Sequence, residues 1–161
     1  LRTRDWEDIS VAAVLAHEHC SRSTFYAHYE DRDALRADAF LGAVEIVPAS
    51  GPGHCLAFVP GLFEHLAHHR VLAEPYLLLG RGGPMVVAFR DRITAHIRER
   101  LDLTAPDLTK SQRGEVAAAL SGAVWAAMLW WLEHGRDVIP SDAAATLLAL
   151  LGPGLSRLTH D

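Results

Sequence analysis

Residues 10–35 decide the fold of this chain, and they read SVAAVLAHEHCSRSTFYAHYEDRDAL. Ser10 can cap a short helix over about residues 11–17, because a serine at the N-cap accepts a hydrogen bond from the first helical turn. After a break, Ser21 can cap a second short helix over about residues 22–29. Two short helices joined by a turn of three or four residues are the outline of a helix-turn-helix.

The second of these helices has two different faces. At 100° per residue, Phe25 and Tyr29 fall on one side, which predicts an aromatic inner face. The outward and flanking positions are small or polar: Ser23, Thr24, Tyr26, Ala27 and His28. Small outward residues let a helix enter the major groove of DNA, and flanking hydroxyl, imidazole and guanidinium groups suit phosphates. The pattern therefore favours a nucleic-acid interface.

Residues 21–29, SRSTFYAHY, followed by residues 31–35, DRDAL, resemble the signature of the TetR family of transcriptional regulators. Residues 8–11, DISV, are similar to the family's entry into its second helix. The resemblance implies an all-α homodimer, with an N-terminal helix-turn-helix domain followed by a helical-bundle domain for ligand binding and dimerisation. It implies a repressor that binds a palindromic double-stranded DNA operator and is released by a small-molecule effector. The residues implied to contact DNA are Ser10, Ser21, Arg22, Thr24, Tyr26, His28 and Arg32, with Ser23 and Ala27 facing the groove.

The chain departs from the family at the turn, where Glu18-His19-Cys20 replaces the customary Ala-Gly-Val. Glycine adopts a left-handed backbone easily, so we expect His19 either to adopt it at a cost or to change the turn. Residues 1–36 hold five arginines against seven acidic residues, in a chain of net charge −5, which is unfavourable for DNA binding. The family's first helix is not in this sequence, and basic residues in a helix preceding Leu1 would offset these acids.

Helical periodicity dominates the rest of the chain. The segment PASGPG at 48–53 is the clearest linker, so we expect domains at 1–47 and 48–161. Helical patterns follow near 54–69, 72–79, 84–102, 107–134 and 141–158. Gly135 fits the C′ position after the fourth of these, and Gly152-Pro153-Gly154 is expected to kink or stop the last.

Several apolar and polar residues of the C-terminal part are candidates to line a ligand pocket. They are Phe58, Leu62, His65, Tyr76, Met85, Phe89, Trp125 and Met128. The alternative is that they form an ordinary core. The helix around Trp125, Trp130 and Trp131 is apolar nearly all round, which indicates that residues near 113–134 and 141–158 form the homodimer interface.

Other classes of function have less support. His65 and His69 are four residues apart, but no Cys or carboxylate is spaced to complete a metal site, and we expect neither metal nor cofactor. No catalytic arrangement stands out, so we expect that the chain is not an enzyme.

The uncharged segment 116–132 is slightly short for a membrane span and is expected in a core or an interface. Two cysteines without a disulfide pattern favour the cytoplasm. The alternative function is a helical small-molecule-binding protein without DNA binding.

Overall fold

The computed structural model describes residues 10–32, 34–35, 54–78 and 83–160. Every regular element among these residues is an α-helix, which confirms the predicted all-α class. The chain divides into two compact units, Leu1–Ala43 and Val44–Asp161. The sequence predicted the boundary slightly later, after residue 47, because the glycine- and proline-rich segment begins there.

The N-terminal unit contains two short helices, α1 (Val11–His17) and α2 (Arg22–His28). Both begin where the sequence predicted, directly after a capping serine, and α2 ends one residue early. The sequence also predicts a third helix that begins at Glu30 or Asp31 and extends to about Val47. Asp31 accepts a hydrogen bond from the backbone N–H of Ala34 at 2.7 Å, as expected at the start of that helix. Most of that predicted helix lies outside the described residues.

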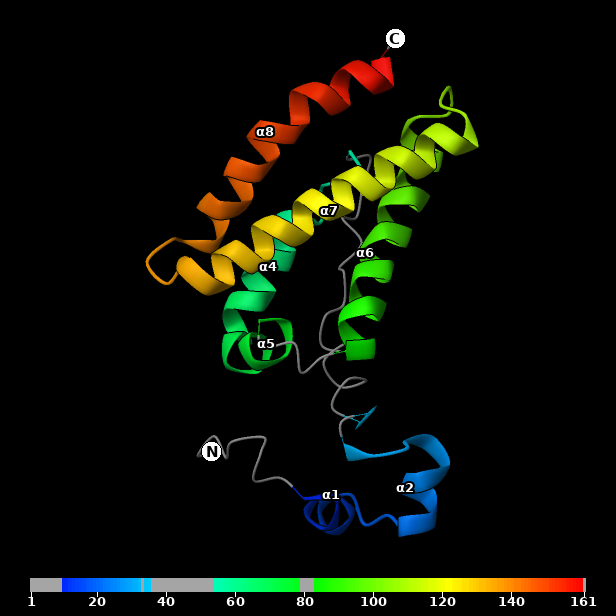
Figure 1. Cartoon of the computed structure of the whole chain (residues 1–161), viewed down its shortest axis with the longest axis vertical. Helices are drawn as coiled ribbons and strands as arrows, with labels where there is room; N and C mark the ends of the chain where they lie inside the picture. The colour runs from blue at the N-terminus through cyan, green and yellow to red at the C-terminus, as the bar shows by residue number, and fades with distance from the viewer. Residues whose placement is uncertain (1–9, 33, 36–53, 79–82, 161) are drawn as a thin grey trace. The chain divides into compact units, whose positions relative to one another are not determined.

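The C-terminal unit contains five described helices. They are α4 (Val59–His68), α5 (Arg70–Leu77), α6 (Gly83–Thr104), α7 (Lys110–His134) and α8 (Pro140–His160). The yellow helix α7 crosses the unit and packs against α5, α6 and α8, while α4 packs against α5 and α8 (Figure 1). Because α7 contacts three other helices, it is the central element of this unit.

Two helix boundaries differ from the sequence prediction. Residues 54–58 precede α4 as a turn in which Ala57 N–H donates to His54 O, so the helix starts at Val59. The last helix does not stop at residues 152–154 but continues through Pro153. The carbonyl that a proline at this position leaves unbonded belongs to Ala149, which is exposed and therefore open to water. Of the predicted kink or stop, the stop is therefore wrong, and the kink stays a prediction.

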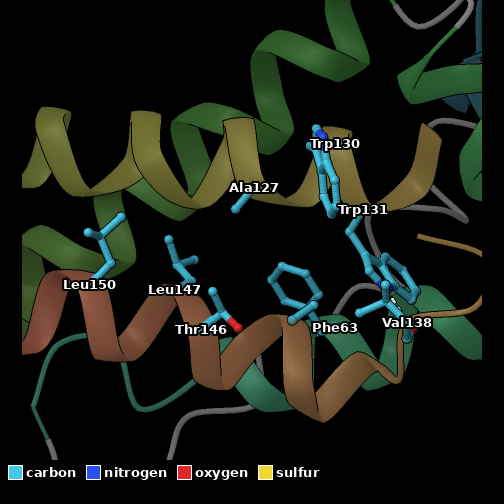
Figure 2. A pocket seen from close by; sticks show the side chains of 9 residues that line it. Phe63, Ala127, Trp130, Trp131, Val138, Thr146, Leu147 and Leu150 are labelled. Atoms are coloured by element: carbon cyan, nitrogen blue, oxygen red, sulfur yellow. Dashed lines mark hydrogen bonds between the residues drawn. The ribbon is translucent and has the colours of Figure 1, made fainter. Parts of the chain in front are cut away.

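Trp131 anchors the C-terminal end of α7. Its side chain is 2% exposed and lies 5.6 Å from the ring of Phe63 of α4, between centroids (Figure 2). The indole Nε1 donates to Val138 O at 3.0 Å, so the buried polar atom is satisfied. The guanidinium of Arg70 lies 4.8 Å above the ring and also donates to Leu132 O. One side chain therefore joins α4, α5, α7 and the loop that leads to α8.

Gly135 ends α7 for a different reason from the one predicted. It is the C-cap residue, with φ −90° and ψ 32°, and not a left-handed C′ residue. A Cβ atom at this position would lie 2.5 Å from Cδ1 of Trp131. Glycine is therefore required by the close approach of the tryptophan ring rather than by backbone conformation.

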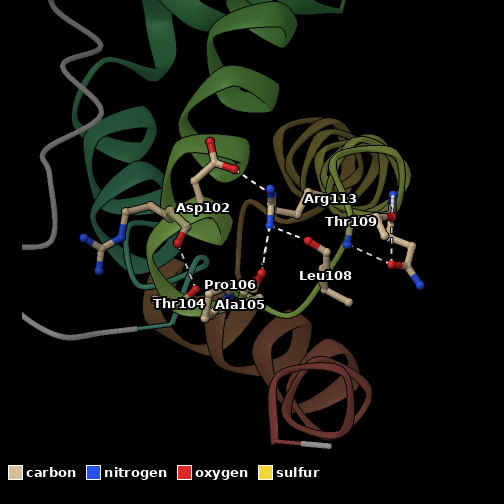
Figure 3. Close-up of polar contacts among 9 residues, drawn as sticks. Asp102, Thr104, Ala105, Pro106, Leu108, Thr109 and Arg113 are labelled. Carbon is tan, nitrogen blue, oxygen red and sulfur yellow. Dashed lines mark hydrogen bonds and ion pairs between the residues drawn. The ribbon is translucent and has the colours of Figure 1, made fainter.

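Arg113 holds the connection between α6 and α7 (Figure 3). Its Nη1 donates to three backbone carbonyls of the loop, those of Ala105, Pro106 and Leu108. Its Nε pairs with Asp102 at 2.7 Å. Beside it, Thr109 and Gln112 form a reciprocal capping box at the start of α7. Side chains in this connection therefore satisfy three loop carbonyls and the N–H of Gln112.

Helix α7 buries one face and exposes another that is almost as apolar. The buried face includes Ser121, whose hydroxyl hydrogen-bonds with that of Thr94 on α6 at 2.7 Å. The exposed face is built from small residues and one tryptophan: Ala118, Ala119, Gly122, Ala126 and Trp130. Helix α7 is long and apolar enough to cross a membrane, but the core helix of a soluble protein can have the same length and composition.

Candidate nucleic-acid interface

The helices α1 and α2 are each fixed at their first turn by a serine. Ser10 Oγ accepts the N–H of Ala13 at 3.2 Å, and Ser21 Oγ accepts the N–H of Thr24 at 3.1 Å. Both serines have extended backbones, as N-cap residues do. These interactions confirm the two predicted caps and set where each helix begins.

The turn between the helices contains a strained residue. His19 has φ 51°, in the left-handed region that glycine adopts without penalty. The neighbouring backbone is well bonded, with Glu18 N–H donating to Val14 O and Cys20 N–H donating to Leu15 O. Of the two alternatives expected for His19, a left-handed backbone or a changed turn, the structure has the left-handed backbone. For a residue with a Cβ atom the conformation costs about 1–2 kcal/mol.

Helix α2 has the two faces that its sequence predicted. Phe25 is 4% exposed and is the anchor of the helix, with Tyr29 half-buried at 5.7 Å between ring centroids. Tyr26 stands on the exposed side, with 57% of its surface accessible and its ring edge-on to Phe25. The remaining residues of the helix are all exposed. The ring of Phe25 therefore anchors the helix, and the other side chains of α2 are accessible to a ligand.

Eight of the nine residues predicted to contact DNA are exposed: Ser10, Ser21, Arg22, Ser23, Thr24, Tyr26, Ala27 and His28. Arg32 is half-buried. The hydroxyl of Ser21 lies 2.7 Å from that of Ser23 and 2.9 Å from that of Thr24, which brings three hydroxyl groups together at the start of α2.

The acidic residues of this region lie outside α2. The helix itself, RSTFYAH, carries Arg22 and no acid. Glu18 in the turn pairs with His17 at 3.0 Å, and Asp31 caps the next turn through Ala34. Local charge on the exposed face of α2 is thus more favourable to an anion than the count over residues 1–36 indicates.

The residues predicted to line a ligand pocket lie mainly in the core of the C-terminal unit. Phe58, Leu62, Phe89 and Met128 are buried, and Trp125 and His65 are half-buried. Two ring contacts join members of this set to other helices: Phe58 with His96 of α6, and Phe89 with Trp125. The side chains of Tyr76 and Met85 lie outside the described part of the structure.

His65 is the polar member of that set. Its Nε2 is buried without a hydrogen-bond partner among the described residues. Burial, followed by the neighbouring His69 and His68, lowers the pKa of His65 below 6.5, which keeps the imidazole neutral at neutral pH. The rings of His65 and His69 are 4.5 Å apart, yet the described residues include no group of three or more metal-binding side chains.

Cys55 does not have the surroundings of a reactive thiol. Burial raises the pKa of Cys55 to about 11, so the thiolate is disfavoured. Cys20 is half-buried in the turn between α1 and α2, and both cysteines are free. The described part of the structure therefore gives no support to a disulfide or a redox site.

A groove that the sequence did not predict lies between α7 and α8, with a volume of about 410 Å³ (Figure 2). From α7 it is lined by Ala127, Trp130 and Trp131, and from α8 by Ala143, Thr146, Leu147 and Leu150. Phe63 of α4 and Val138 complete the lining. The only sequence signal is the helical spacing of these residues in two separate segments, which does not show that the segments meet.

No protein-family model matches the sequence, and no curated protein matches it at a significant level.

Proposed function

We propose that this chain is a DNA-binding transcriptional regulator, resembling the TetR family, that acts in the cytoplasm as a homodimer. The observation that carries the proposal is the construction of α2, a capped two-turn helix held by Phe25 with its other side exposed. An exposed helix of small and polar residues suits the major groove. The turn before it keeps a left-handed residue, His19, at the position where the family has glycine.

The exposed residues of α2 would divide the work of recognition. Arg22, Thr24 and Tyr26 offer a guanidinium and two hydroxyl groups to phosphate oxygens or base edges, and His28 offers an imidazole. Ser23 and Ala27 have small side chains, which allow the helix backbone to approach the bases closely. Contacts to phosphate would supply affinity, and contacts in the groove would supply sequence preference.

The homodimer would form through α7 and α8. The exposed side of α7 is a row of alanines and a glycine that ends at Trp130, which is 56% exposed. On α8, Leu150 is 75% exposed and Leu158 is 50% exposed. Small residues permit close packing of helices, and large exposed apolar residues favour burial by a partner. A two-fold dimer would match a palindromic operator.

An effector would act by binding two states of the dimer unequally, one of which has its reading helices at the wrong spacing. A coupling of about 1–3 kcal/mol gives a change in DNA affinity of about 5–150-fold.

The test is a salt-dependent titration of the protein against DNA from around its own gene. We expect selective binding whose affinity falls steeply as salt increases, since phosphate contacts release counterions. Replacing Arg22 by Ala should weaken binding to all sequences and reduce the salt slope by about one. The matched control is Arg98→Ala, an exposed arginine on α6.

Two further variants separate recognition from assembly. Thr24→Ala and Tyr26→Phe should weaken DNA binding while the dimer, measured by sedimentation, stays intact. Loss of the dimer in these variants would assign α2 a structural role. Equally weak binding to all DNA would favour the alternative, a helical small-molecule-binding protein, which the groove between α7 and α8 also supports.

A further inference from the structure

The groove between α7 and α8 has a buried floor and an exposed rim. Phe63 and Trp131 on the floor are 0% and 2% exposed, whereas Trp130 and Leu150 on the rim are 56% and 75% exposed. Figure 2 shows Ala127 and Trp130 on α7 facing Thr146, Leu147 and Leu150 on α8. Its volume of about 410 Å³ falls within the range of about 300–1,000 Å³ that is usual for small-molecule pockets.

The lining has no group that requires a polar ligand. It contains no charged residue, and its polar side-chain atoms belong to Thr146, Trp130 and Trp131, of which Trp130 is exposed to water. Thr146 Oγ1 donates to Asp142 O at 2.9 Å, and Trp131 Nε1 donates to Val138 O at 3.0 Å. Both hydrogens are therefore already used within the protein. A charged ligand would lose water without gaining an oppositely charged partner among the lining residues.

One aromatic ring of the rim is held in a fixed orientation. Trp130 stacks on His134, with 5.6 Å between centroids and 21° between planes. The side chain of His134 is also tied to Trp130 O at 3.2 Å. A ring fixed in this way offers a flat apolar surface at low entropic cost.

We propose that the groove between α4, α7 and α8 binds an uncharged hydrophobic small molecule, aromatic or aliphatic, against Phe63, Trp130 and Trp131. The binding itself does not depend on the function proposed above. If the chain is also a DNA-binding regulator, this molecule is a candidate effector, because two rim residues of the groove, Trp130 and Leu150, also lie on the faces proposed for dimerisation.

The first experiment uses the uncharged dye Nile red with the full chain and no DNA. Dye fluorescence should rise on binding, and naphthalene should displace the dye. Naphthoate, which has the same rings and a carboxylate, should compete at least about tenfold less well, a difference of about 1.4 kcal/mol. Equal competition by the two compounds would overturn the assigned ligand class. Absence of dye binding would overturn the site.

Two variants locate the bound dye. Ala127→Leu fills the groove and should weaken dye binding about tenfold or more. Ala95→Leu makes the same change at an exposed position on α6 and should leave binding unaltered. Because Ala127→Leu also changes helix packing, Leu150→Ala provides a second, independent measurement of dye binding in the groove. It removes contact area from the exposed rim and should weaken binding severalfold with unchanged helical circular dichroism.

The competing occupant is a second copy of the chain. Dye affinity that falls as protein concentration rises would show that the partner fills the groove. That result would overturn the proposal. Because every measurement here omits DNA, failure of this proposal would be distinct from failure of the DNA-binding proposal.

Discussion

The two units of this protein are stabilised in different ways. In the N-terminal unit α1 and α2 have seven residues each, and among the described residues Phe25 is the one buried side chain. In the C-terminal unit α6, α7 and α8 have 22, 25 and 21 residues. Their buried faces carry most of the core.

The difference has a consequence for how each unit responds to change. Isolated helices shorter than about 12–15 residues are marginal in water, so α1 and α2 depend on their caps and on local hydrogen bonds. The long helices depend on burial of apolar surface against one another. We therefore expect substitutions in the C-terminal unit to act on global stability, and those in the N-terminal unit to act locally.

The largest effect is expected from Trp131→Ala. It removes a buried ring that contacts α4 and α5, and should lower the free energy of unfolding by about 3–5 kcal/mol. The control is Trp130→Ala, next in the chain but more than half exposed, with an expected loss of about 1 kcal/mol or less. Urea denaturation followed by circular dichroism measures both. Similar losses would contradict the central role of Trp131.

A smaller effect is expected from Arg113→Met. The variant leaves three loop carbonyls without their donor and should lower the free energy of unfolding by about 2–3 kcal/mol. Asp102→Asn removes only the ion pair, and because the Asp102 side chain is 56% exposed we expect a loss of under about 1 kcal/mol. If both variants lose the same stability, the ion pair and not the carbonyl contacts holds the loop.

In the N-terminal unit, Ser21→Ala should weaken the start of α2 by about 1 kcal/mol. The amides of α2 should then exchange with solvent faster, while those of α7 keep their protection. Ser23→Ala is the control, because the Ser23 hydroxyl touches Ser21 but caps no backbone N–H. Hydrogen exchange measures amide protection in both units. A loss of protection in both would show that the stability of one unit depends on that of the other.

The smallest effect, and the only gain, is expected from His19→Gly. Relief of the left-handed strain, partly offset by the greater freedom of glycine in the unfolded chain, should stabilise the turn by about 0.5–1 kcal/mol. His17→Gly makes the same change in the right-handed backbone of α1 and should instead destabilise by about 1 kcal/mol. Hydrogen exchange of α1 and α2 distinguishes the signs.

The sequence predicted the local features of the fold closely and the contacts between distant segments poorly. Ser10 and Ser21 cap the helices that they were expected to cap, and His19 adopts the expected backbone. Of the kink or stop predicted at residues 152–154, the stop was wrong, because an exposed proline is tolerated where water can satisfy the freed carbonyl. The groove was missed entirely, since its lining comes from α4, α7 and α8.

By itself the sequence determined the all-α class, the caps and the inner and outer faces of α2. These features depend on interactions between residues no more than four or five positions apart, so the local sequence is enough to predict them. Only the tertiary structure decided which of two apolar faces of α7 is buried, and it also showed why Gly135 must be a glycine. Those outcomes depend on which surfaces meet, because α7 is apolar on both faces and only its packing against α5, α6 and α8 distinguishes them.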